Sequence, residues 1–337
     1  MNLHNKTDWQ TALMNAVTEP KELLTLLEFD DELLDAANKA AKHFPLKVPH
    51  SFIARMEKKN INDPLLQQVL PIGAELENIA GFSADPLQET KVNPVKGLLH
   101  KYHGRVLLTY VATCAVNCRY CFRREFPYKK NNPGSSGWND ALDYISHNAS
   151  IKEVILSGGD PLVANDNHLK NFIEKLAMVP HVTRLRIHSR LPIVLPERIT
   201  TEFIQAISAT RLKTVMVIHC NHPQEINLEV KQAMKMLAKA DVFLLNQSVL
   251  LKGINDHADT LISLSETLFT AGVHPYYLHL LDKVRGTAHF DLNRQTAIEL
   301  YKTMTERLPG YLLPKLVSEQ PGAPSKSLVE SRELCTD

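Results

Sequence analysis

Three of the five cysteines in this 337-residue sequence lie close together, in the stretch TCAVNCRYCFRREFP. Cys114, Cys118 and Cys121 form a C-x3-C-x2-C arrangement. One short loop with three thiolates can bind three irons of a 4Fe–4S cluster and leave the fourth iron open to another ligand. Structural zinc needs four ligands, and although His103 or His219 could supply one, the sequence has no second CxxC pair. The spacing therefore favours an iron–sulfur cluster over zinc.

A second motif that could do chemistry is SGGDP, which directly follows the apolar run EVIL. Its first four residues are Ser157, Gly158, Gly159 and Asp160. Glycine lets the backbone approach a ligand closely, and a turn from a strand into a helix exposes N–H groups toward that ligand. No Gly-Lys-Ser or Gly-Lys-Thr follows, so the motif is not a phosphate-binding P-loop. The alternative is a tight turn without a ligand.

These two motifs follow the first two of six short apolar runs that have the composition of strands. The runs are 105–112, 152–157, 182–189, 213–220, 241–249 and 273–281. Amphipathic segments with helical periodicity follow several of these runs, at 165–179, 225–240, 257–271 and 294–308. This alternation predicts an α/β protein with parallel βα units, in a full or partial barrel or an open sheet. In a barrel, both motifs would lie among the catalytic loops at the carboxyl ends of the strands.

The rest of the sequence flanks this α/β region. Residues 1–98 contain apolar residues at helical spacing and a polar, proline-bracketed stretch at 85–94, which together predict an N-terminal helical cap and a linker. Residues 99–308 form the predicted barrel. Residues 309–337 contain a strand-like run and then the Pro- and Gly-rich sequence PGAPSKS.

The overall charge is nearly balanced, since 38 Lys and Arg residues stand against 37 Asp and Glu residues. No global field therefore predicts nucleic acid or an anionic membrane surface as a partner. The start lacks the basic and apolar regions of a secretory signal, and no run of about 18 apolar residues predicts a membrane span. We therefore predict a cytoplasmic protein. In a reducing compartment, clustered cysteines bind metal or do redox chemistry rather than form disulfides.

The cysteine loop, the GGD sequence and the six βα units together resemble the radical S-adenosylmethionine superfamily. The resemblance implies a partial (β/α)6 TIM-like barrel in which the three clustered cysteines bind a 4Fe–4S cluster. S-adenosylmethionine would bind the open iron, with residues 157–160 at its methionine end and His219 and Gln247 beside its nucleoside. An electron from the cluster would then cleave it to methionine and a 5′-deoxyadenosyl radical.

From about Leu99 to Leu328 the resemblance narrows to the lysine 2,3-aminomutases. The phrases that carry it are HKYHGRVLL, CRYCFRREF, LSGGDPL, RIHSRLPIVLPERIT, HCNHPQEI, LLNQSVLLKGIND, PYYLHLLD and PGAPSKS. The most similar branch is the short bacterial one, the elongation factor P β-lysylation enzymes. It implies pyridoxal 5′-phosphate (PLP) as a further cofactor and an isomerase that converts L-lysine to β-lysine of the R form. It also implies an electron-donor protein, and a ligase that attaches β-lysine to elongation factor P.

Matched positions imply how PLP is held, in a short C-terminal segment and at the start of the barrel. Lys326, in PGAPSKS, matches the lysine that binds PLP covalently. Arg105 matches a residue that binds the cofactor phosphate, with Tyr102 nearby and Lys101 in place of the usual arginine. A guanidinium donates two parallel hydrogen bonds to phosphate, whereas lysine contributes a point charge. Longer family members have glycines where this sequence has Ala323–Ser325, so the loop is expected to differ in shape.

Three further matched positions imply how the substrate is bound. Arg123 matches the arginine that pairs with the substrate carboxylate, a contact that would fix the amino acid near the radical. Asp282 and Glu319 match two acidic positions that hold the side-chain ammonium. Because two neighbouring carboxylates are stabilised by a cation between them, the pair favours lysine over an uncharged amino acid. Glu319 stands where longer members have aspartate.

The sequence also departs from the longer aminomutases, which have a cysteine-rich C-terminal extension that binds zinc at a subunit interface. This sequence ends without it, and His257 stands at the position of one of those cysteines. We therefore expect no zinc, and the oligomeric state stays open. Cys220 is expected to be a small core residue, and Cys335 is also expected not to bind metal. Two alternatives remain: an aminomutase for another amino acid such as glutamate, and a non-catalytic iron–sulfur or zinc-binding module.

Overall fold

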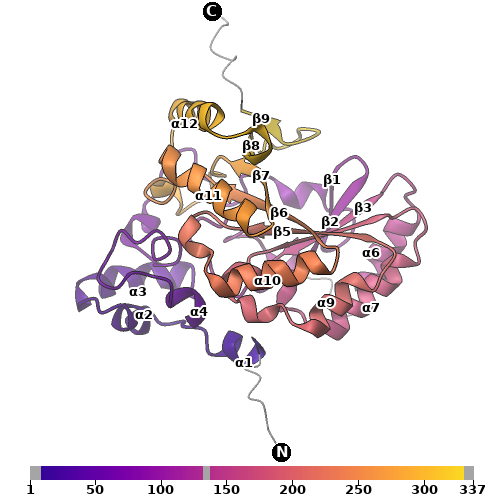
Figure 1. Ribbon diagram of the computed structural model, residues 1–337, viewed down its shortest axis with the longest axis horizontal. Coiled ribbons are helices and arrows are strands. Elements are labelled where there is room, and N and C mark those ends of the chain that lie inside the picture. The colour runs from indigo at the N-terminus through magenta and orange to yellow at the C-terminus, as the bar shows by residue number, and fades with distance from the viewer. Residues whose placement is uncertain (1–8, 132–136, 330–337) are drawn as a thin grey trace, which may run out of the picture.

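One β-sheet organises the computed structural model, which describes residues 9–131 and 137–329 (Figure 1). In these residues, nine strands pair in the order of the chain. They are β1 (Leu98–Tyr102), β2 (Arg105–Val111), β3 (Glu153–Gly158), β4 (Arg184–Ser189), β5 (Lys213–His219), β6 (Phe243–Val249), β7 (His274–His279), β8 (Lys315–Ser318) and β9 (Ser327–Leu328). Strands β2 to β8 are parallel, and β1 and β9 are antiparallel edges. Because the described edges do not pair with each other, the sheet is an open, partial barrel, as predicted.

The helices connect successive strands or precede the sheet. They are α1 (Trp9–Met14), α2 (Pro20–Leu26), α3 (Leu34–His43), α4 (His50–Ile53), α5 (Tyr128–Asn131), α6 (Gly137–Ser146), α7 (Asp166–Ala177), α8 (Leu191–Val194), α9 (Thr201–Ser208), α10 (Leu228–Lys239), α11 (Ala258–Thr270) and α12 (Arg294–Arg307). Figure 1 shows α7, α9 and α10 along one side of the sheet, with α2, α3 and α4 grouped at one end. No helix in the described ranges combines the length and the apolar character needed to cross a membrane.

Local sequence explains where the long helices begin. Asparagine or threonine stands just before four of them and accepts a hydrogen bond from a backbone N–H of the first turn, which would otherwise lack a partner. These residues are Asn165, Thr200, Asn227 and Asn293, with donor–acceptor distances of 2.8–3.1 Å. The six predicted strands correspond to β2 through β7, and the four predicted helices to α7, α10, α11 and α12. Strand β1 and helix α6 were not predicted.

The N-terminal cap is less helical than predicted. Its α-helices end at Ile53, and residues 54–97 form turns and two short 3-10 helices, Gly73–Leu76 and Glu89–Val92. Prolines interrupt the helical periodicity there, because proline lacks an N–H donor and clashes with the preceding turn. They are Pro64, Pro71, Pro86 and Pro94. The proposed domain boundaries near residues 98 and 308 stay predictions.

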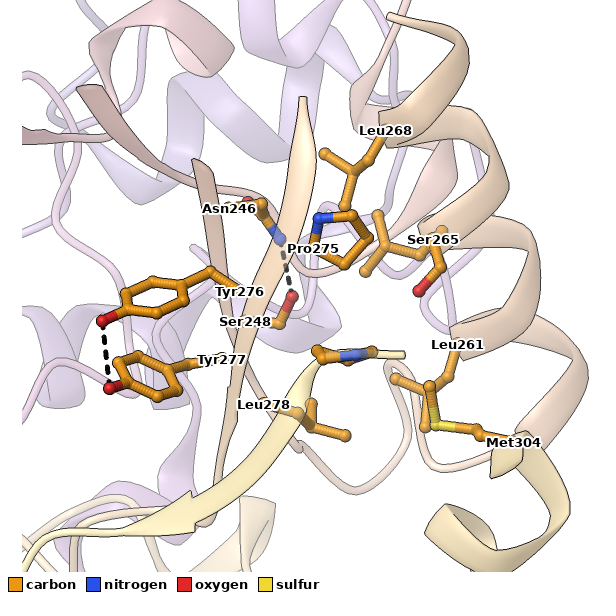
Figure 2. A pocket seen from close by; sticks show the side chains of 12 residues that line it. Asn246, Ser248, Leu261, Ser265, Leu268, Pro275, Tyr276, Tyr277, Leu278 and Met304 are labelled. Carbon is orange, nitrogen blue, oxygen red and sulfur yellow. Dashed lines mark hydrogen bonds between the residues drawn. The ribbon is translucent and has the colours of Figure 1, made fainter. Parts of the chain in front are cut away.

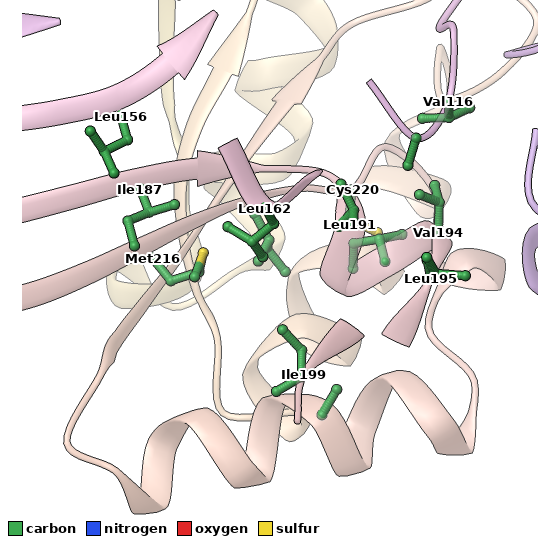
Figure 3. Packing of buried hydrophobic residues seen from close by; sticks show 14 of the residues in the cluster. Val116, Leu156, Leu162, Ile187, Leu191, Val194, Leu195, Ile199, Met216 and Cys220 are labelled. Carbon is green, nitrogen blue, oxygen red and sulfur yellow. The ribbon is translucent and has the colours of Figure 1, made fainter. Parts of the chain in front are cut away.

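A continuous hydrophobic core joins the N-terminal region to the barrel. Leu23 and Leu66 belong to the same buried cluster as Leu108 of β2. Figure 3 shows part of this cluster, in which Val116 of the cysteine loop packs near residues of α8. Cys220 is fully buried there, which confirms that it is a core residue; Cys335 lies outside the described residues. The cysteine loop is therefore anchored in the core.

A bulge in β7 places two tyrosines on the same side of the sheet. The register with β6 shifts between Asn246 and Gln247, so that Tyr276 is the extra residue. Consecutive side chains of a regular strand alternate between faces, but Tyr276 and Tyr277 lie side by side, with ring centroids 3.8 Å apart and a 3.0 Å hydrogen bond between their hydroxyls (Figure 2). The small pocket in Figure 2, about 10 Å³, has room for about one water molecule and no ligand. The tyrosines also border a much larger cavity.

Candidate functional site

The larger cavity, of about 440 Å³, lies inside the partial barrel. It extends from residues at the strand starts, such as Arg105, to the loops at the carboxyl ends. All sixteen predicted site residues line it: Lys101, Tyr102, Arg105, Cys114, Cys118, Cys121, Arg123, Ser157, Gly158, Gly159, Asp160, His219, Gln247, Asp282, Glu319 and Lys326. The structure thus brings together residues that are more than 200 positions apart in the sequence.

The cysteine loop follows β2 and turns three free thiols toward the cavity. Burial and the neighbouring thiols Cys118 and Cys121 raise the pKa of Cys114, and burial raises the pKa of Cys121 to about 11. Protein atoms alone therefore disfavour three thiolates here, and a positively charged group must accompany them. In the described chain, no three His, Cys, Asp or Glu side chains are grouped for a single metal ion. Three thiols on one short loop suit an iron–sulfur cluster, in which each sulfur binds a different iron.

The N-terminal region holds this loop with buried ion pairs. Arg119 Nε donates to Glu75 Oε1 at 2.8 Å, and Arg124 Nη2 lies 2.7 Å from Glu75 Oε2. Both guanidinium groups also face the Phe44 ring, at 4.8 and 4.6 Å from its centroid. Asn117 completes the contact with a backbone hydrogen bond to Lys47. The loop's shape is therefore fixed by residues about 40 to 75 positions earlier in the sequence.

The two glycines of the GGD sequence are required by the chain itself. Gly158 has a φ of +102°, and a Cβ there would lie 2.6 Å from Thr109 Cα. A Cβ on Gly159 would lie 2.4 Å from the carbonyl oxygen of Thr113. The groups that the glycines approach in the fold are Thr109 of β2 and Thr113, just before the first cysteine, whereas close approach to a ligand stays a prediction. The glycines hold β3 against the cysteine loop.

Asp160 joins the ends of β3 and β4. Its carboxylate accepts hydrogen bonds from Ser189 Oγ and Arg190 N, both at 2.7 Å, and from the backbone N–H groups of Leu162 and Leu191. Burial raises its pKa, and these four donors oppose the rise. All four bonds come from the chain and fix the turn, while contact of Asp160 with S-adenosylmethionine stays a prediction.

The opposite end of the cavity holds alternating charges. Glu319 lies between Lys326 Nζ at 2.5 Å and Lys101 Nζ at 2.9 Å, and Lys101 also lies 3.1 Å from Glu89. Burial opposes ionisation of Glu319, but Lys326 and Lys101 outweigh it and hold the pKa of Glu319 well below its usual range. The structure therefore places Lys101 between two carboxylates. Arg105 lies apart from them, 4.7 Å above the Tyr102 ring.

Arg123 is paired with a residue that sequence analysis missed. Its Nε and Nη2 donate to the two carboxylate oxygens of Glu89 at 2.7 and 2.8 Å, and Nη1 lies 3.3 Å from Ser157 Oγ. Burial opposes ionisation of Glu89, but Arg123 and Lys101 outweigh it and lower its pKa. Glu89 lies in the predicted linker, where nothing in the sequence distinguishes it from its polar neighbours. Only the folded position of the linker shows its contact.

The carboxylate of Asp282 differs from the other acids of the cavity in its contacts. No hydrogen bond or ion pair reaches it from the described residues, and burial together with the charge of Glu319 raises its pKa to about 7. A cation that binds beside Asp282 would restore its ordinary ionisation. The electrostatics of this position therefore favour a cation beside Asp282.

Three histidines add neutral donors or acceptors to the cavity wall. His219 Nε2 and Gln247 Nε2, on adjacent strands, are 2.7 Å apart, and burial followed by the charges of Arg190 and Arg123 lowers the pKa of His219 to about 3. His188 and His279 each have a buried Nε2 without a partner in the described chain. Burial also lowers the pKa of these two well below the usual range. All three are therefore neutral at pH 7.

An open βα barrel with three cysteines on the loop after its first parallel strand, packed against a GGD turn, defines an iron–sulfur enzyme of the radical S-adenosylmethionine type. Residues 102–183 match the family described as "4Fe-4S single cluster domain". An L-lysine 2,3-aminomutase of Haemophilus influenzae is 49% identical, over 97% of this chain and 96% of the relative. That of Escherichia coli is also 49% identical with the same coverage, and that of Clostridium subterminale is 34% identical over 96% of this chain and 77% of its own. The chain belongs to the L-lysine 2,3-aminomutase family.

The cavity residues fit the three groups that this family uses, a 4Fe–4S cluster, S-adenosylmethionine and PLP. Three thiols line the cavity, with no fourth cysteine among its described lining residues, and this set suits a cluster with one open iron. Buried nitrogens without partners in the described chain, Arg190 Nε, His188 Nε2 and His279 Nε2, are available to bound groups. Lys326 supplies a primary amine at the end of the cavity lined by Glu319. Roles of individual residues toward these groups stay predictions.

Proposed function

We propose that this protein is an L-lysine 2,3-aminomutase, which moves the amino group of L-lysine from carbon 2 to carbon 3 and so forms β-lysine. The observation that carries the proposal is one cavity lined by the three cysteines, by Lys326 and by the carboxylates of Asp282 and Glu319. Relatives of that name at 49% identity support the same reaction. When bound, the cluster with S-adenosylmethionine supplies a carbon radical, and PLP supplies a conjugated system through which nitrogen can migrate.

The chain's own residues bind and orient the amino acid. Glu89 accepts from Nε and Nη2 of Arg123, so the substrate carboxylate would bind at the other edge of the guanidinium, formed by Nη1 and Nη2, where Nη1 also donates to Ser157 Oγ at 3.3 Å. At the far end, Asp282 binds the side-chain ammonium. A substrate held at both ends would keep carbons 2 and 3 at a fixed depth in the barrel cavity.

The charges of the cavity favour lysine over glutamate. A glutamate side chain would place a third carboxylate beside Asp282 and Glu319, where burial and mutual repulsion already raise the pKa of Asp282. Lysine instead brings the missing cation. An aminomutase for an acidic amino acid is therefore disfavoured by this wall of the site.

We also propose where the product goes. The resemblance to the short bacterial branch supports transfer of β-lysine, in its R form, to a ligase that attaches it to elongation factor P. The enzyme would then work in the cytoplasm with an electron-donor protein that reduces the cluster. Mass spectrometry of elongation factor P from cells with and without the active chain tests this step, and unchanged modification in its absence would contradict it.

The reaction itself is tested without oxygen, with reductant, S-adenosylmethionine, PLP and L-lysine, and with identification of the product by mass spectrometry. We expect β-lysine from the parent chain and at least a 1,000-fold loss in Lys326→Arg, because arginine keeps the charge beside Glu319 but has no amine that can attach PLP. Lys315→Arg, at an exposed position at the start of strand β8, is the matched control and should retain activity. Absence of β-lysine from a parent chain with full cluster content would refute the proposal.

A further inference from the structure

Arg190, directly after β4, contacts one of the three cluster cysteines. Its Nη1 lies 2.7 Å from Cys118 Sγ, and the side chain is 5% exposed. Among the described side chains, no arginine donates in this way to Cys114 or Cys121. The three sulfurs are therefore not equivalent in their surroundings.

The guanidinium is fixed by several other groups. Its Nη2 donates to Gln68 Oε1 at 2.6 Å and lies 3.2 Å from Glu225 Oε2, while its backbone N–H donates to Asp160 at 2.7 Å. The Tyr120 ring lies 5.5 Å from the guanidinium carbon. Because so many contacts hold it, the donor does not need to reorient when the charge of the sulfur changes.

Glu225 is the counter-charge of this arrangement. It is fully buried, and its carboxylate also accepts hydrogen bonds from the backbone N–H groups of Asn221 and His222. The positive charge beside Cys118 is thus present but partly neutralised at a fixed distance. The guanidinium of Arg190 therefore lies between the sulfur of Cys118 and the carboxylate of Glu225.

A hydrogen bond to a ligating sulfur, and a positive charge near it, stabilise the more negative state of an iron–sulfur cluster. Reduction adds one electron from an external reductant to the cluster and no proton, so this stabilisation raises the reduction potential. We propose that Arg190 sets the reduction potential of the cluster through Cys118 Sγ, and that Glu225 limits the increase. Arg190 is a positioning residue in this role, since it acts through the cysteine ligand.

The test uses variants with expected shifts of opposite sign. Each variant is reconstituted with iron and sulfide without oxygen, its iron and sulfide content is measured, and the reduced cluster is followed by electron paramagnetic resonance during titration with dithionite. At the parent midpoint potential, we expect Arg190→Met to lower the ratio of reduced to oxidised cluster at least tenfold, which is 59 mV for one electron. Arg190→Lys should lower it about threefold, because a point charge remains. Glu225→Gln should raise the ratio, because the guanidinium loses its counter-charge.

Arg55→Met is the matched control. Arg55 is partly buried, also contacts Glu225 through its backbone oxygen and packs on Phe52, but it does not touch Cys118. We expect its ratio to stay within twofold of the parent value. If Arg190→Met does not hold a cluster, Arg190→Lys and Glu225→Gln decide the question. Variants that hold full clusters and titrate at the parent potential would overturn the proposal.

Discussion

The two ends of the cavity differ in how their charges are balanced. At the cluster end, the carboxylates of Glu75 and Asp160 are filled by donors from the chain, mostly arginine and backbone N–H groups. At the other end, Glu319 is paired with two lysines, and Asp282 has no partner in the described residues. The cluster end is built before any group binds. At the opposite end, under the proposed function, cofactor and substrate would supply the remaining charges.

The residue types match this difference. The Arg119–Glu75 pair is almost fully buried, with side-chain exposures of 0% and 1%, whereas Lys326 and Glu319 are 22% and 14% exposed. Arginine presents a rigid fork that holds one geometry, whereas lysine carries a compact charge on a flexible chain that can move to another partner. Arginine therefore makes the cluster end a fixed end, and lysine makes the opposite end an adjustable end.

Glu75→Gln is the change expected to have the largest effect on the cluster end. It leaves two buried guanidinium groups without their carboxylate, which typically costs about 3–5 kcal/mol. We expect a loss of about this size in the free energy of unfolding, measured by denaturant titration, and a reduced iron content after reconstitution.

The control for this change is Asp35→Asn, which breaks the exposed pair with Lys39 on α3. Exposed pairs contribute about 0–1 kcal/mol, so its unfolding curve should nearly coincide with that of the parent. Equal losses in the free energy of unfolding for Glu75→Gln and Asp35→Asn would contradict the claim that burial makes the ion pairs of the cluster end stronger than exposed pairs.

Asp282→Asn tests the adjustable end. We expect kcat/KM for L-lysine to fall about 100-fold, because the ammonium loses its charged partner. The free energy of unfolding of the ligand-free variant should rise, although its activity falls. Because the pKa of Asp282 is raised from 3.8 to about 7 in the fold, this group makes stability fall as pH rises between these values. The ligand-free variant should therefore be more stable than the parent at pH 8, on the order of 1–3 kcal/mol.

Thermal unfolding at pH 8 and at pH 5 separates this effect from general repacking. At pH 5 the folded carboxyl is protonated but the unfolded one is still mostly ionised, so the difference between the two chains should fall to about half or less, and it should disappear only below pH 3.8. A variant that is equally destabilised at both pH values would contradict the assignment of Asp282 as an unfilled cation site.

Sequence analysis predicted the parts of the molecule that depend on local pattern. The six strands β2 to β7 follow from short apolar runs, and the cysteine loop follows from its own spacing. The family resemblance supplied Lys326, Arg105 and Asp282, which no local pattern distinguishes from surface charges. All of these lie on one cavity because the carboxyl ends and inner faces of parallel strands converge.

The residues that were missed act through long-range contacts. Glu75 and Glu89 lie in 3-10 helices of four residues, which are too short to show a periodic pattern that would indicate burial. Arg190 lies within one of the phrases that carry the family resemblance, but no local pattern indicates its contact with Cys118. That contact depends on the position of the end of β4 beside the loop after β2. Strand β1 was missed because it is a short edge strand. Among the described strands it pairs with β2 alone, and a tight turn at Gly104 connects the two strands. Such pairings become visible when the chain is folded.

Glu89→Gln tests whether the linker belongs to the fixed or the adjustable end. Glutamine can accept one hydrogen bond from Arg123 but removes the charge that also pairs with Lys101. We expect KM for L-lysine to rise about tenfold with kcat nearly unchanged, because a misoriented Arg123 weakens binding of the carboxylate in ground and transition states alike. Steady-state kinetics without oxygen measure both constants.

A variant of a nearby half-buried acid, Asp85→Asn, would not serve as a control because Asp85 accepts from the backbone N–H of Glu89. Glu77→Gln, just after the 3-10 helix Gly73–Leu76 and outside the cavity, is suitable. A fall in kcat with unchanged KM in Glu89→Gln would instead place Glu89 in the reaction step.

The smallest expected effect is a pH dependence of substrate binding. The ammonium of lysine binds the ionised form of Asp282, whose pKa is about 7 before substrate binds. Protonation below that value removes the binding partner, so KM should be about fourfold higher at pH 6.5 than at pH 8. In Asp282→Asn this dependence should vanish, because no carboxyl remains to titrate. If instead KM of the parent is constant across this range, Asp282 is already ionised in the free enzyme. A cation other than the substrate ammonium would then have to stabilise its carboxylate.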